Sequence, residues 1–203
     1  MDKEEKKIDW NLLNLAPEEE RVKINEKLEG IKVKRGQIIT WALEIEELLE
    51  GILTNYFINP FSKKTKFFEV EVMRDMKFET KKQIFQKILE NEKYENEDSK
   101  KIVSLIQNIQ EMRNKVAHWR ILVFLQKGEV KLRKKQSLED EMLSLTDEML
   151  KKLEEDKEQA FQETIQFNRW FWAKEVKELN EYLKKQSEIK NSIMEEDKNG
   201  DKS

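Results

Sequence analysis

The chain has 203 residues, of which 40% are charged and 37% hydrophobic, and its formal net charge is −3. This length suffices for one domain with a substantial core, and the negative balance means that any nucleic-acid site would have to be a local basic patch. The absence of cysteine excludes a disulfide framework and a zinc site with thiolate ligands.

The N-terminal segment is not expected to be an export signal. Its first ten residues, MDKEEKKIDW, are too charged for a signal sequence, and the sequence holds no run of about 18 apolar residues. We therefore expect a cytoplasmic protein that makes no contact with a membrane. Residues 1–35 are predicted to form an extension, in which Pro17 and the three glutamates after it begin a helix that ends at Gly30.

The predicted core helices occupy residues 36–118. Apolar residues recur every three or four positions across residues 36–58, in a stripe wide enough for burial on more than one side, and Asn59-Pro60 should end this helix. Residues 61–77 fit either a strand or a helix, and we favour irregular or helical structure. Another helix is predicted over residues 79–90, with inward side chains at Ile84, Phe85, Ile88 and Leu89.

The next predicted helix ends in the sequence Arg-Asn-Lys-Val-Ala-His at residues 113–118. Arg113 falls about 20° from Ile102 on the helical wheel, within the apolar face. A guanidinium there must find an acceptor, reach water or bind an anion. His118 falls about 140° further round, so the two side chains converge only if the helix ends near Ala117 or a second copy of the chain contributes. The apolar face comprises Ile102, Leu105, Ile106, Ile109, Met112 and Val116.

Residues 119–135 are predicted to form a β-hairpin, because β-branched and apolar residues dominate both sides of Lys127-Gly128. Thr146 is a predicted N-cap, and residues 143–187 are expected to form C-terminal helices, as one rod or two pieces. Residues 191–203 lack periodicity and are predicted to be a disordered tail.

The predicted fold class is mainly α, a helical bundle with a small β-hairpin after an Arg-x4-His motif. One domain, residues 1–190, would contain the extension, the core helices, the hairpin and the C-terminal helices. Ten phenylalanines and five tryptophans supply bulk for its core.

The Arg-Asn-x-x-Ala-His form of residues 113–118 resembles the R-x4-6-H signature of the HEPN superfamily, the higher eukaryotic and prokaryotic nucleotide-binding proteins. The resemblance extends loosely over residues 36–185, and only the hexad is diagnostic. It implies a helical bundle that dimerises and, as in many members, a metal-independent endoribonuclease of toxin–antitoxin, abortive-infection or CRISPR-linked defence. Relatives paired with nucleotidyltransferase antitoxins often carry a tyrosine where this chain has Arg120, so silencing by modification of such a tyrosine is not expected here.

The activity that this resemblance implies is RNA cleavage by attack of the 2′-hydroxyl on the adjacent phosphorus, which leaves a 2′,3′-cyclic phosphate and needs no metal or cofactor. Arg113 would contact phosphate oxygens and His118, the only histidine, would transfer protons. Asn114 would bind phosphate or hold the imidazole, and Arg120 would bind phosphate. One histidine cannot fill both proton-transfer roles at once, which favours a homodimer with a shared cleft. Expected partners are RNA, a second copy, and an antitoxin or defence-system protein.

The alternative function is a non-catalytic helical module that binds nucleotide, RNA or a partner protein. In that case Arg113 would pair with a buried acid or helix-end carbonyls, and His118 would cap the helix.

Other features leave alternatives open. The sequence has no Walker loop, dinucleotide fingerprint or nucleophile-elbow motif. Trp119 would be core, or would stack on a base. The segment 168–172 would be core or a dimer contact, with a nucleotide-stacking shelf as the alternative. Three short basic runs would either guide RNA or serve solubility; they lie at Lys63-Lys64-Lys66, Lys81-Lys82 and Arg133-Lys134-Lys135.

Overall fold

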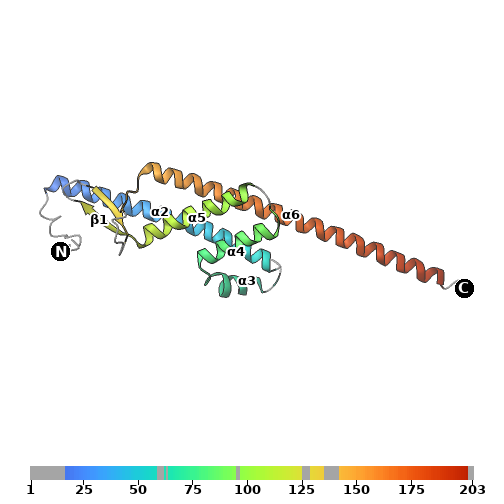
Figure 1. The fold of residues 1–203 in the computed structure, drawn as a ribbon. Coiled ribbons are helices and arrows are strands. Elements are labelled where there is room, and N and C mark those ends of the chain that lie inside the picture. Colours follow the sequence, from blue (N-terminus) through green and yellow to red (C-terminus); the bar gives the residue numbers. More distant parts are fainter. Residues whose placement is uncertain are drawn as a thin grey trace, which may run out of the picture. The chain divides into compact units, whose positions relative to one another are not determined.

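The computed structural model describes residues 17–58, 62, 64–94, 97–124, 129–134 and 142–200. By internal contacts the chain divides into two units, Met1–Phe161 and Gln162–Ser203, where the sequence predicts one domain. Helices dominate both units, and the first also holds a small antiparallel sheet, so the predicted fold class is confirmed (Figure 1).

Helix α2, Glu18–Phe57, is a single helix of 40 residues. The predicted end at Gly30 is therefore wrong. A glycine inside a helix costs about 1 kcal/mol relative to alanine, whereas each large apolar side chain that is buried contributes about 1.5–3 kcal/mol. Ile24, Leu28 and Ile31 flank Gly30 and are all buried, so the burial of this stripe outweighs the cost of the glycine.

The segment after α2 is partly helical and partly turns where the structure describes it, in line with the irregular or helical structure that we favoured. It contains α3, Thr65–Phe68, and the π-helix η1, Glu69–Met73, followed by α4, Phe78–Asn91. The alternating apolar residues do not form a strand here. Met73 is buried, whereas Val70 and Val72 are exposed. Helix α4 matches its predicted range, with Ile84 half-buried and the other predicted inward residues buried.

Helix α5, Glu97–His118, packs with α4 against α2. Five of the six residues of its predicted apolar face are buried, and only Met112 is half-buried. The helical period of the sequence therefore places the motif of residues 113–118 on a firmly packed helix.

The sheet has the order β1-β2-β3, with β1 Arg120–Phe124, β2 Glu129–Arg133 and β3 Met142–Leu143. Strands β1 and β2 confirm the predicted pairing of the hairpin, whose Lys127-Gly128 turn lies outside the described residues. Strand β3 was not predicted, because two residues are too few to show alternation. The inner face of the sheet packs on Ile24 and Leu28 of α2.

Helix α6, Asp147–Gly200, is one helix rather than two. The backbone N–H of Met149 donates to Oγ1 of Thr146 at 3.2 Å, which confirms the N-cap. The helix continues through residues 191–200, where the sequence predicts a disordered tail. Extending an existing helix needs no new nucleus, and glutamate, lysine and methionine favour it. Within the described ranges, no helix has the length and apolar character needed to cross a membrane.

Candidate functional site

The motif of residues 113–118 forms the last turns of α5, and β1 begins two residues after it. Ile109 and Val116 are completely buried and hold this end of the helix in the core. Asn114 and His118 are exposed, and Arg113 is half-buried. The polar groups of the motif are thus presented at the surface of a rigid element.

Arg113 finds a neutral acceptor instead of a buried acid. Its Nη1 donates a hydrogen bond to Oδ1 of Asn114 at 3.1 Å. In the part of the chain that the structure describes, no carboxylate pairs with its guanidinium. Because an amide oxygen carries no charge, no ion pair among the described residues compensates the positive charge of Arg113.

His118 is the final residue of α5, and its imidazole has no hydrogen-bond partner among the described residues. Helix α5 ends at His118, one residue after Ala117, as the sequence predicts, but no hydrogen bond joins Arg113 to His118 among the described residues. The structure therefore joins Arg113 to Asn114 and does not join either of them to His118 through a hydrogen bond. Asn114 and His118 are four residues apart, however, and so share one face of the helix.

Two arginines lie opposite each other on β1 and β2. In the strand register Arg120 pairs with Arg133, and the next residues, Ile121 and Leu132, belong to the inner face that packs on α2. The two guanidinium groups therefore project from the outer face, where like charges directly opposite each other are unfavourable.

Trp119, between α5 and β1, is half-buried. Its backbone N–H donates to the carbonyl oxygen of Lys115 at 2.9 Å, which continues the hydrogen bonding of α5 by one residue. This position links the helix to the hairpin. Half-burial leaves both predicted roles open, packing in the core and stacking on a base.

Lys81 and Lys82 are not available to RNA, so the alternative that this basic run guides RNA is wrong. Lys81 is 1% exposed and pairs with Glu46 at 2.7 Å and with Glu50. Burial alone would lower the pKa of Lys81, but its hydrogen bonds to the two carboxylates outweigh this effect and raise it. Lys82 is 6% exposed and pairs with Glu79 at 2.9 Å.

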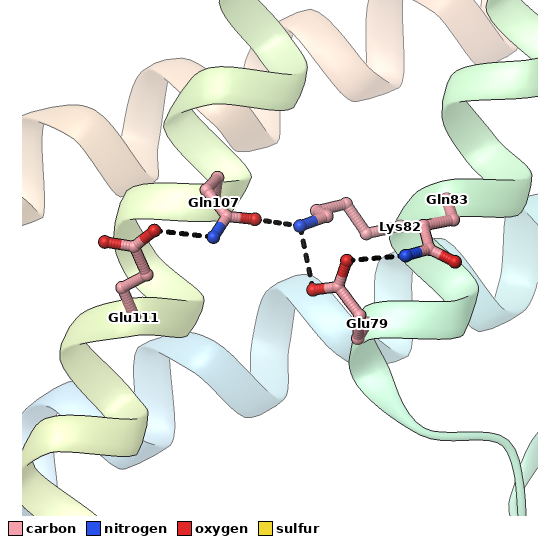
Figure 2. A network of polar contacts seen from close by, with 5 residues as sticks. All are labelled: Glu79, Lys82, Gln83, Gln107 and Glu111. Atoms are coloured by element: carbon pink, nitrogen blue, oxygen red, sulfur yellow. Dashed lines mark hydrogen bonds and ion pairs between the residues drawn. The ribbon is translucent and has the colours of Figure 1, made fainter.

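Lys82 also begins a polar network between α4 and α5 (Figure 2). Its ammonium donates to Oε1 of Gln107, and Nε2 of Gln107 donates to Oε1 of Glu111 at 2.6 Å. The hydrogen bond from Lys82 lowers the pKa of Glu79. Sequence reasoning missed Glu111. The signal that could have found it is the spacing of Gln107, Glu111, Asn114 and His118, which repeats every three or four residues.

The two remaining basic runs are exposed in part. Lys64 and Lys66 are exposed at the start of α3, and Lys134 is exposed after β2. Lys63 and Lys135 lie outside the described residues.

The aromatic cluster of residues 168–172 belongs to the second unit. Phe171 is buried, and Trp170 and Trp172 are half-buried. Nζ of Lys174 lies 5.5 Å from the ring centroid of Trp170 and covers a face of that indole, which weakens the stacking-shelf alternative.

Comparison with known proteins found no matching family model, no matching curated protein and no matching solved structure. Among the described residues there is also no group of three or more histidine, cysteine, aspartate or glutamate side chains placed to hold a metal ion.

Proposed function

We propose that this protein is an endoribonuclease that cleaves RNA without a metal ion, by attack of the 2′-hydroxyl to give a 2′,3′-cyclic phosphate and a 5′-hydroxyl. The observation that carries the proposal is the uncompensated guanidinium of Arg113, bonded to Asn114 on the face where His118 is exposed. This reaction needs positive charge near phosphate and a group that transfers protons, and the end of α5 supplies both.

A guanidinium suits phosphate because its planar donors match two phosphate oxygens. Arg113 has such donors to offer, since its only described hydrogen bond uses Nη1. Arg120 and Arg133, opposed across β1 and β2, add a second basic feature close in sequence to His118. Together they provide the local basic patch that an RNA site requires in a chain of net charge −3.

The proposed enzyme is a homodimer in which two copies of the motif face a shared cleft. Since no described hydrogen bond joins Arg113 to His118 within one chain, a second copy would bring an Arg113 guanidinium over the His118 face. The setting that the HEPN resemblance implies is cytoplasmic defence or a toxin–antitoxin pair, with an antitoxin or defence-system protein as the partner that restrains cleavage.

The test is cleavage of end-labelled RNA by the purified protein in excess EDTA. We expect the parent protein to leave cyclic-phosphate ends, and His118→Ala and Arg113→Ala to lose cleavage by about 100-fold or more. Both variants should stay folded, with Arg113→Ala losing less than about 1 kcal/mol in urea unfolding, because it removes one partly exposed hydrogen bond.

Lys87→Ala is the matched control, since Lys87 is an exposed cation on α4 and lies outside the three basic runs. It should cleave at the parent rate if the effect of Arg113→Ala is specific. Folded parent protein that cuts no RNA, or variants that cut as fast as the parent, would contradict the proposal. The binding module would then be the better description, and RNA retention without cleavage would identify it.

A further inference from the structure

The proposed reaction needs two proton-transfer groups, one to accept the proton of the 2′-hydroxyl and one to protonate the departing 5′-oxygen. The chain has one histidine, His118. A second group must therefore be a different residue or belong to another chain. Glu111, on the same helix, has a carboxylate that can accept a proton.

Glu111, Asn114 and His118 lie on one exposed face of α5. At about 100° per residue, the three positions fall within an arc of about 60°. At 1.5 Å per residue, Glu111 and His118 are separated by about 10 Å along the helix axis, with Asn114 between them. In an in-line displacement the attacking and leaving oxygens stand on opposite sides of phosphorus. A phosphate at Asn114 would thus have Glu111 on one side and His118 on the other.

The orientation of the Asn114 amide supports this placement of phosphate. Oδ1 of Asn114 accepts the hydrogen bond from Arg113, so the Nδ2 donors of Asn114 point elsewhere and can serve a phosphate oxygen. Arg113 therefore orients the amide of Asn114 and also supplies positive charge.

The network of Figure 2 holds Glu111 in place. The ammonium of Lys82 can only donate, so Gln107 must turn its oxygen toward Lys82 and its nitrogen toward Glu111. Lys82 is itself fixed by burial and by its ion pair with Glu79. One oxygen of Glu111 is thereby held by Gln107, which leaves its other oxygen to accept a proton.

We propose that Glu111 is the general base of this site, that His118 is its general acid, and that Gln107 is a positioning residue for Glu111. This assignment rests on the proposed function. The Glu111 carboxylate takes the proton of the 2′-hydroxyl while the 2′-oxygen bonds to phosphorus. The bond from phosphorus to the 5′-oxygen breaks, and the His118 imidazolium gives its proton to that oxygen. Exchange with water then restores the Glu111 carboxylate and the His118 imidazolium.

The experiment compares an ordinary RNA with one whose scissile 5′-oxygen is replaced by sulfur. A thiolate leaves without protonation, so this substrate no longer needs a general acid. We expect His118→Ala and Glu111→Gln each to slow cleavage of ordinary RNA by about 100-fold or more. The sulfur substrate should restore His118→Ala to within about tenfold of the parent and leave Glu111→Gln slow.

Two further variants complete the comparison. Glu71→Gln removes an exposed carboxylate of η1 and should cleave both substrates at the parent rate. Gln107→Met removes the donor to Glu111 and should resemble Glu111→Gln in a weaker form, slow on both substrates.

The failures are distinguishable. A folded parent that cuts neither RNA overturns the proposed function and this assignment with it. A parent that cuts, with Glu111→Gln cutting ordinary RNA equally fast, overturns the role of Glu111 and leaves the nuclease intact. Rescue of Glu111→Gln by the sulfur substrate would also overturn the assignment, because a base is needed whatever the leaving group.

Discussion

Arg113 and Lys81 are both cations on helices that pack in the core, but they differ in burial and in hydrogen-bond partners. Lys81 is 1% exposed and is held by Glu46 and Glu50. Arg113 is half-buried and its one described hydrogen bond is to the neutral amide of Asn114. A cation that is buried with compensation is a structural element, whereas one presented at the surface without it can bind an anion.

Lys81→Met tests this distinction. We expect it to lower the free energy of unfolding by about 2–4 kcal/mol, because it leaves two carboxylates without their partner. This loss is at the low end for removal of one partner of a buried ion pair, since the side chains of Glu46 and Glu50 are still 19% and 31% exposed. Urea unfolding measures the change. An effect as small as that of Lys87→Ala, at an exposed site, would show that the ion pairs of Lys81 do not stabilise the fold.

The ion pairs of Lys81 with Glu46 and Glu50 also predict that the free energy of unfolding depends on pH. The pKa of Lys81 is raised above its usual value of 10.5, so the folded state holds this proton more tightly than the unfolded chain. Its contribution to stability is complete below pH 10.5 and is lost as pH rises through the higher pKa of the folded state. Unfolding curves at neutral pH and above pH 10.5 should show this loss in the parent and less of it in Lys81→Met.

At the scale of the element, the helices follow the apolar period more faithfully than they follow the residues that usually end helices. The stripe of α2 passes Gly30 without interruption, since Leu28 and Ile31 are buried on either side. The Arg-x4-His motif takes its rigidity from the same kind of stripe on α5. Hence the element, not the motif alone, determines how Arg113 and His118 are presented.

Gly30→Ala should raise the free energy of unfolding by about 0.5–1 kcal/mol. Alanine loses less conformational entropy in a helix than glycine, and a Cβ at Gly30 would have no atom within 4 Å. The midpoint of urea unfolding is the measurement. A lower midpoint would mean that α2 does need the freedom of a glycine at this position, as a helix end there would.

At the scale of the whole molecule, the proposed site calls for a second copy of the chain. We expect the mass in solution, measured by light scattering after size exclusion, to be twice the 24.6 kDa of one chain. Dilution should also lower the cleavage rate per chain as dimers separate. A 24.6 kDa species whose rate per chain stays constant on dilution would contradict the shared cleft and leave an enzyme that acts as a monomer.

The sequence by itself determined the mainly α fold, the buried face of α5, the hairpin pairing and the N-cap at Thr146. These features depend on local period and on local hydrogen bonding, both of which are written in consecutive residues. It also singled out the residues of the Arg-x4-His motif, whose catalytic role is still a prediction.

Only the tertiary structure decided which charged groups are satisfied internally. In the sequence, Lys81 and Lys82 resemble the other basic runs. In the structure, their partners come from α2 and α5, which are far from them along the chain. The same packing placed Gln107 between Lys82 and Glu111, and the strand register placed Arg120 opposite Arg133. Such pairings depend on which elements pack against each other. No local pattern in a single sequence shows which elements these are.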